Sequence, residues 1–539
     1  MEKKALTAIV LSVAVLLLYQ FFYIKPLTEK QRLAAQQAAQ TAAQVKVETK
    51  TTAADNTPKE ATAPTTEAKN NTAVNTPALA NETPNAHVPI KQITVDTLHY
   101  TAIVNSVGGT IESFKLKDYK NNDKKDIELI DKTAKYGAFV IGATTDFELS
   151  QAAFATDSKN ITLNGTDTGQ VILDYESNGK KIRRTYTFYA NSYKVELKDE
   201  TSGISPYYIT IGSGFSRDGG DGYAAHFGPV VLNGMDRVEF NEDKKMDDIK
   251  KYPDGVKWIA EENKYFCTAL VPQGPMAETT VWQIPATPSV KQKSLVAFKS
   301  TNSSNEFLIY AGPKKYDFLK ALNVSLEPIV DFGYFSIIAR PLFWFLLFLN
   351  KYLGNFGVAI IVLTLIVRIP FIPLINKGQS SMKKLQKIQP LMTEIREKHK
   401  KDPQKMQREM MELYKVHKVN PMGGCLPIVI QIPVFFALYK ALLVSVELRG
   451  APFFFWVTDL SAKDPIYVLP VIMGITMFIQ QKMTPTTMDP TQAKIMMIMP
   501  IVFTFMFLSF PSGLVLYWLV SNLLSIAQQT YVNRKAAVT

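Results

Sequence analysis

Cysteine is scarce in this chain of 539 residues, which excludes a disulfide-stabilised scaffold. Cys267 and Cys425 are the only two, and we expect them to lie in different domains and not to pair.

Aromatic residues are missing between Tyr23 and Tyr100. Residues 28–90 are instead rich in Ala, Thr, Gln, Glu, Asn and Pro, and bury too little apolar surface to offset their ordering entropy. We predict a disordered tether there.

Extremes of composition are also absent. The chain is 47% hydrophobic and 20% charged, with a mean hydropathy of −0.01, which excludes a collagen-like chain and a wholly disordered one. The formal charge is +12. A net positive charge suggests an anionic partner such as nucleic acid or a membrane surface. Where the basic residues lie along the chain decides between these two partners.

The chain begins with a long apolar run. Residues 5–24 are almost uninterrupted apolar, follow Lys3 and Lys4, and end in bulky residues. The run exceeds the apolar core of a signal peptide and lacks a small-residue cleavage site, so an uncleaved anchor is favoured over a cleaved signal. The lysines place its N-terminus in the cytoplasm.

Residues 91–330 have the pattern of a large antiparallel β-sandwich. Apolar and polar residues alternate, and Gly-Gly and Asn-Gly pairs separate the runs. Two β-rich runs, 182–189 and 193–197, suggest a hairpin, and 316–330 is expected to be helical. In one Gly-rich loop Asp218, Asp221 and His226 could bind a metal or a sugar, but the spacing is not that of a calcium loop. We favour a plain polar connection.

The last third of the chain is strongly apolar. Within 331–355 the longest uninterrupted apolar run has nine residues. That is too short to cross a hydrocarbon core of about 30 Å and suits a helix lying in the interface. Five further runs predict spans, which with the first anchor makes six. The predicted segments are the anchor 1–27, the tether 28–90, the β domain 91–330, the interfacial helix 331–355, the second span 356–375, a cytoplasmic hairpin 376–420, the third span 421–446, a periplasmic loop 447–464, the fourth span 465–481, a cytoplasmic loop 482–494, the fifth and sixth spans 495–530 and a cytoplasmic tail 531–539.

The basic residues then fall on one side of the membrane. Eighteen Lys and Arg occupy the cytoplasmic segments against two in the loop 447–464, a strong positive-inside pattern. The N- and C-termini are therefore cytoplasmic and the β domain lies outside. Residues 376–420 hold twelve basic and five acidic residues. Their apolar residues recur at helical spacing, predicting two amphipathic helices broken at Asp402-Pro403. This hairpin is either a lipid-facing basic surface or a docking surface for ribosomal RNA, a targeting factor or an emerging chain.

The most informative single charge is Arg368. It is the thirteenth residue of the apolar run 356–375, where a charge costs at least about 2.5–3.5 kcal/mol. The predicted spans contain no Asp or Glu to neutralise it, so an unpaired arginine implies a wet cavity, with snorkelling to the headgroups as the alternative. Lys440 is expected to snorkel outward. The apolar run 495–510 would reach only about 24 Å, and a locally thinned bilayer would ease the passage of polar chain segments.

Several long motifs in this part of the chain resemble the YidC membrane-protein insertases. They are 420–439, 445–449, 459–461, 481–485, 510–517 and 520–522. The tether and β domain look like the Gram-negative form, in which that domain is a β-supersandwich similar to sugar-mutarotase folds. The resemblance implies a polytopic α-helical protein with a five-helix insertase core, located in the bacterial inner membrane. Its clients would be nascent inner-membrane proteins, inserted alone or with the Sec translocon.

The resemblance also implies which residues act. The hydrophilic groove is expected to be lined by Arg368, Thr364, Gln431, Tyr517, Trp518, Ser521 and Asn522. Docking of the ribosome, a targeting factor and lipids is expected at Lys383, Lys384, Lys387, Lys400, Lys401, Lys405, Arg408 and Asp489. Trp518 stands where tyrosine is frequent, and Lys440 where the family commonly has an aromatic or apolar residue. No enzymatic step, metal or cofactor is expected, because the sequence has no phosphate-cradling Gly-rich loop and no nucleophile–base pair stands out in the β domain. DNA is not an expected partner.

The main alternative function is a solute transporter or channel. It would need inverted repeats and paired broken helices around a midplane site. The sequence shows no internal repeat.

Overall fold

The computed structural model describes residues 88–538, apart from 122, 218–225, 242–244, 247, 285–292, 401, 418, 420–425 and 484–489. The predicted anchor 1–27 and nearly all of the tether 28–90 lie outside the described residues. So do Asp218, Asp221, Cys425, Lys401 and Asp489.

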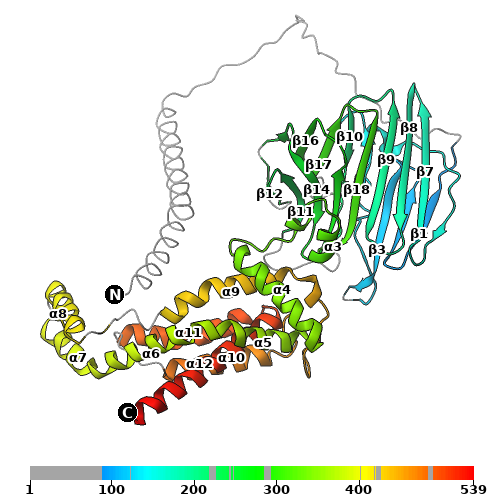
Figure 1. Ribbon diagram of the computed structural model, residues 1–539. Helices are drawn as coiled ribbons and strands as arrows, with labels where there is room; N and C mark the ends of the chain where they lie inside the picture. The colour runs from blue at the N-terminus through cyan, green and yellow to red at the C-terminus, as the bar shows by residue number, and fades with distance from the viewer. Residues whose placement is uncertain are drawn as a thin grey trace, which may run out of the picture. The chain divides into compact units, whose positions relative to one another are not determined.

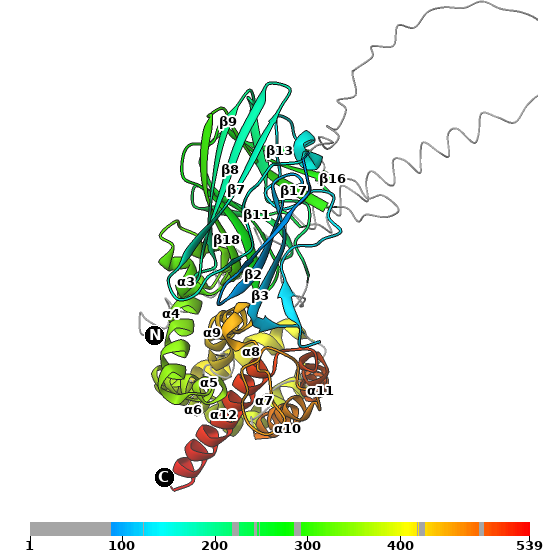
Figure 2. The same cartoon turned by 90° about the vertical axis from the view of Figure 1, so that its right-hand side faces the viewer.

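The first described region is built of β-strands, as the alternating pattern predicted (Figures 1 and 2). The strands are β1 Gln92–Asp96, β2 Tyr100–Asn105, β3 Thr110–Lys120, β4 Asp126–Glu128, β5 Ile141–Gly142, β6 Ile161–Thr162, β7 Thr168–Ser177, β8 Lys180–Tyr189, β9 Lys194–Ser202, β10 Tyr207–Thr210, β11 Gly228–Asn233, β12 Asp236–Glu239, β13 Lys250–Tyr252, β14 Val256–Glu262, β15 Phe266–Pro272, β16 Glu278–Ile284, β17 Lys293–Ser300 and β18 Ser304–Pro313.

The described strands form three sheets. Two have five strands, in the orders β4-β3-β2-β1-β6 and β13-β16-β17-β10-β5, and the third has eight, in the order β12-β11-β14-β15-β18-β9-β8-β7. The predicted hairpin is confirmed, since β8 and β9 pair antiparallel with Phe188 opposite Val195. One pair departs from the antiparallel prediction, because β6 joins β1 in parallel through Val95 and Ile161.

The helix predicted over 316–330 was too long. Helix α3 covers only Tyr316–Ala321, and a short 3-10 turn, η3, follows at Glu327–Ile329. Between them Asn323 and Ser325 have φ angles of 54° and 55°, a left-handed backbone that ends a right-handed helix.

Helices make up the rest of the chain and gather in a bundle (Figure 1). They are α4 Ser336–Leu353, α5 Phe356–Arg368, α6 Ile372–Lys387, α7 Gln389–Lys398, α8 Pro403–Val416, α9 Leu426–Val444, α10 Val468–Met483, α11 Pro490–Phe507 and α12 Ser512–Val538, with short 3-10 turns η4 Ile369–Phe371 and η6 Val446–Leu448. By length and composition two stretches could cross a membrane, α4 and the α5–α6 rod Phe356–Lys387. Shorter apolar helices lie at Gln431–Val444, Val468–Met483 and Met497–Phe507.

The helix ends differ from the predicted segment boundaries. The rod that starts at Phe356 continues past 375 through α6 to Lys387, so the segment 376–420 holds the end of one rod followed by the α7–α8 hairpin. Asp402 caps α8 as the Asp-Pro break predicted, its carboxylate accepting from the Lys405 N–H at 3.0 Å. The last helix also runs on to Val538 through the predicted tail 531–539.

Candidate functional site

Arg368 lies where α5 ends and the chain tightens into η4. Pro370 follows it and has no N–H to continue an α-helical ladder. The guanidinium reaches across to α12, where Nη1 donates to the Ser521 carbonyl at 2.8 Å and to the Ser521 hydroxyl at 3.2 Å. Nη2 donates to the Ser525 hydroxyl at 2.6 Å. The charge is therefore held by neutral oxygens.

Arg368 forms no ion pair with any side chain in the described part of the chain. Its Nε is buried and has no hydrogen-bond partner among those residues. A buried donor without a partner, here on a half-buried cation, is costly. The site therefore retains capacity for an acceptor, either water or an acidic ligand.

A cavity surrounds the guanidinium. Its volume is ≈ 40 Å³, which is room for a few water molecules. It is lined by Thr364, Val367, Arg368, Phe371, Ile375, Gln431, Val434, Tyr517 and Ser521. Polar groups thus meet in a wall that is otherwise apolar.

The Ser521 hydroxyl joins three helices. It accepts from the Gln431 side-chain amide of α9 at 2.6 Å as well as from Arg368 of α5, while belonging itself to α12. Thr364 is less available, since its hydroxyl donates to the Ile360 carbonyl of its own helix at 2.6 Å. Gln431, Arg368 and Ser521 are therefore the groups that a ligand would compete for.

Two of the predicted groove residues do not line this cavity. Trp518 packs into an aromatic cluster with Phe435, Phe503 and Phe507. Asn522 faces α10, and its amide donates to the Thr476 hydroxyl at 3.3 Å. The reason is helical geometry, because residues four apart share a face while the next residue is rotated by about 100°.

The polar face of α12 continues past Ser521 through Ser525, also a candidate lining residue from the sequence. Ser525 holds Arg368, and one turn further Gln528 donates to the Asn376 side chain of α6 at 2.8 Å. The spacing 521, 525, 528 is the sequence signal for one polar stripe. Asn376 and Gln528 carry no signal of their own that would single them out.

The predicted docking residues are spread over several elements. Lys383 is engaged, its Nζ donating to the Val532 carbonyl of α12 at 2.9 Å. The other described members are exposed: Lys384, Lys387, Lys400, Lys405 and Arg408. The hairpin has its own small core of Leu385, Ile388, Met392 and Val419, against which Met410, Leu413 and Tyr414 pack.

Two further expectations concern charged groups elsewhere. No cluster of three or more metal-ligating side chains occurs within the described ranges, and His226 instead contacts the Pro229 carbonyl at 3.2 Å. Lys440, which was expected to snorkel outward, has its Nζ 3.5 Å from a carboxylate oxygen of Asp331, in the segment between the β domain and α4; its direction relative to the membrane stays a prediction. The carboxylate of Asp331, which is distant in the sequence, is the partner of the Lys440 side chain.

Comparison with known proteins covers both regions. A family described as 60Kd inner membrane protein matches residues 348–538, and one described as YidC periplasmic domain matches residues 92–345. The membrane protein insertase YidC of Geotalea daltonii is 40% identical over 553 residues, covering 99% of this chain and 99% of that protein. That of Syntrophus aciditrophicus is 41% identical over 560 residues, covering 99% of this chain and 100% of that protein.

A crystal structure described as an active YidC insertase with its first transmembrane domain resolved covers 82% of this chain and 94% of that chain. Its identity is 20% and the TM-score 0.38, too low to carry an argument about geometry. The matches over nearly the whole length confirm the resemblance seen in the motifs. The chain belongs to the YidC family of membrane protein insertases.

Proposed function

We propose that this protein inserts and folds newly made inner-membrane proteins through the cavity around Arg368. The observation that carries the proposal is a half-buried cation held by neutral oxygens inside an apolar bundle, with a buried Nε donor unused. A charge within an apolar helix bundle is expensive and marks a site that interacts with polar ligands. The relatives named as insertases supply the activity.

The mechanism is an exchange of hydrogen-bond partners. An acidic N-tail or short hydrophilic loop of a client enters from the cytoplasm, and its carboxylate takes the place of Ser525 on the guanidinium. Charge-assisted pairing of Arg with a carboxylate is stronger than bonding to neutral hydroxyls. The cavity of ≈ 40 Å³ has room for a few water molecules, and in our proposal α9 and α12 separate to admit a peptide segment, which breaks the Gln431–Ser521 bond.

The energy for insertion comes from the client. Its apolar segment slides past the third and fifth spans into lipid, and burial of that segment contributes about 25 cal/mol per Å² of apolar surface. The membrane potential adds about 2.3 kcal/mol per charge at 100 mV for an acidic tail. We propose no covalent step, nucleotide, metal or cofactor.

We place the protein in the bacterial inner membrane with six spans, cytoplasmic termini and a periplasmic β-supersandwich. The support is the distribution of basic residues, eighteen against two, and the match to a YidC periplasmic domain over 92–345. In this arrangement α4 lies in the interface, exposing Ile337 and Tyr352, which are 87% and 71% exposed, with Tyr334 just before the helix 92% exposed.

The partners we propose are nascent membrane proteins, the Sec translocon, lipids, and the ribosome with its targeting factor. The exposed basic side chains of the α7–α8 hairpin support the last of these, since they suit an anionic surface. The alternative function, a solute transporter or channel, receives no support from the relatives, which are named as insertases.

Photo-crosslinking to a stalled nascent membrane protein tests this function. A crosslinker at Thr364 or Tyr517, which line the cavity, should capture the client's hydrophilic segment. The matched control is Asn522, on the same helix as Tyr517 but facing α10. Equal capture from Asn522 and Tyr517, or capture from neither cavity position, would contradict a client path through this cavity.

A further inference from the structure

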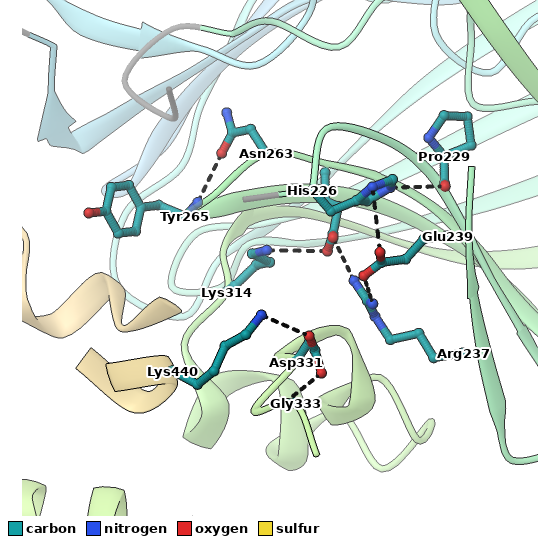
Figure 3. Close-up of polar contacts among 11 residues, drawn as sticks. His226, Pro229, Arg237, Glu239, Asn263, Tyr265, Lys314, Asp331, Gly333 and Lys440 are labelled. Carbon is teal, nitrogen blue, oxygen red and sulfur yellow. Dashed lines mark hydrogen bonds and ion pairs between the residues drawn. The ribbon is translucent and has the colours of Figure 1, made fainter. Parts of the chain in front are cut away.

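Lys440 lies on the face of α9 that meets the segment leading into α4. Its Nζ is 3.5 Å from one carboxylate oxygen of Asp331, while the other accepts the Gly333 N–H at 2.8 Å (Figure 3). Gly333 has a φ of 68°, and a Cβ placed on it would sit 3.4 Å from the Lys440 methylenes. The segment that leads into α4 therefore contacts Lys440 in two ways, through the Asp331 carboxylate and through the close approach of the Gly333 backbone.

An aromatic pair reinforces the same contact one helical turn away. Phe436 precedes Lys440 by four residues and stacks on Phe335, with ring centroids 6.3 Å apart and planes inclined by 17°. We call this set the α9 junction: Asp331, Gly333 and Phe335 against Phe436 and Lys440. It holds the five residues just before α4 on one face of α9.

The junction continues into a charged network of the β domain. Arg237 donates to Glu262 at 2.6 Å and also pairs with Glu239, and Lys314 lies 3.2 Å from Glu262 (Figure 3). Burial opposes ionisation of Asp331, yet its pKa lies below the ordinary value because the Gly333 N–H, Lys440 and Arg237 stabilise the carboxylate. Three cations, Lys440 among them, thus balance three carboxylates.

A second attachment lies just beyond the end of α9. Arg449 donates to the Lys120 carbonyl of β3 at 2.8 Å, and its guanidinium lies over the rings of Tyr265 and Phe266, 5.7 and 5.3 Å from their centroids. Since α9 also carries Gln431 in the cavity, one helix, with Pro433 between Gln431 and Lys440, links the junction to the Arg368 site.

We propose that Lys440 is a positioning residue: through Asp331 it fastens α9 to the start of α4 and to the β domain, and so sets where α9 stands in the cavity wall. Lys440 then acts without touching the client. The link to insertion rests on the proposed function, whereas the attachment itself does not.

Hydrogen exchange of the full chain in nanodiscs tests the attachment, read from peptides covering 331–335. K440M should raise the exchange rate about two- to five-fold, the range for losing a partly exposed ion pair. K440R should restore the wild-type rate. The control K351M removes an exposed lysine of α4 and should change nothing. D331N should raise the rate at least as much as K440M, because it also removes the charge that faces Arg237, and the double variant should be no faster than D331N. An unchanged K440M, or additive effects in the double variant, would overturn the pairing.

Insertion assays then separate this role from that of Arg368. K440M should slow insertion of clients with acidic and neutral tails to the same degree, because it moves a helix and leaves the cavity charge in place. If exchange rises while both insertion rates stay at wild-type values, the positioning role is wrong although the attachment is real. Failure of the Thr364 crosslink would instead sink the proposed function and leave the exchange result standing.

Discussion

Replacing Arg368 by alanine should remove the preference for acidic clients. At about 4 Å, two unit charges attract by about 4 kcal/mol at an effective dielectric constant of 20. A client carboxylate must first displace the Ser525 hydroxyl, and one hydrogen bond to a charged group is worth about 1.5–3 kcal/mol. The net preference is about 1–2.5 kcal/mol, or about five- to seventy-fold.

The assay compares two clients in proteoliposomes with no imposed membrane potential. They differ only in the N-tail, where Asp and Glu of one are Asn and Gln in the other. The ratio of the two insertion rates cancels general damage to the protein. We expect the ratio to fall close to one in Arg368→Ala.

Arg368→Lys should retain most of the ratio. A lysine preserves the charge but loses the planar fork that contacts both Ser521 and Ser525. The electrostatic reasoning is refuted if Arg368→Ala keeps the wild-type ratio, or if Arg368→Lys loses it as fully as alanine does.

Three further results are expected. Ser525→Ala removes the hydroxyl that accepts from Arg368 at 2.6 Å and should speed capture of acidic tails several-fold. Thr530→Ala is the control, because the Thr530 hydroxyl bonds its own helix at 2.8 Å. Slower capture by Ser525→Ala would contradict the exchange of partners. Asp199→Asn should destabilise the β domain by about 3–5 kcal/mol, because Arg184 is fully buried and would lose its counter-charge. The loss would be measured as a lower urea midpoint, and a change in unfolding free energy below about 1 kcal/mol would refute this prediction. Burial raises the pKa of Glu447 above 4.5, so the folded state binds its proton more tightly and stability falls as pH rises through the interval above 4.5. Glu447→Gln should flatten that slope and melt higher than wild type at neutral pH, and a lower melting temperature there would count against it.

The sequence predicted features that depend on local pattern. Alternation indicated the strands, and the β8–β9 hairpin followed from two β-rich runs with a short connection. Apolar spacing predicted the amphipathic hairpin, whose buried side includes Leu385 and Met392. The position of Arg368 within an apolar run was enough to single it out, because a charge near the middle of such a run is costly to insert.

Only the tertiary structure decided which partners these residues have. Arg368 and Ser521 are 153 positions apart, and nothing in the local pattern of either segment records that α5 and α12 adjoin. The rotation of α12 likewise separated Tyr517 and Ser521 from Trp518 and Asn522. A helix fixes which residues share a face, but packing against its neighbours fixes where that face points.

Lys440 is the clearest case of this division. By sequence it was a charge in an apolar helix, for which the nearest headgroup was the default partner. The partner is Asp331, brought close by a left-handed Gly333 and a stacked Phe335. Sequence sets the cost of burying a charge, and the fold alone determines which group offsets it.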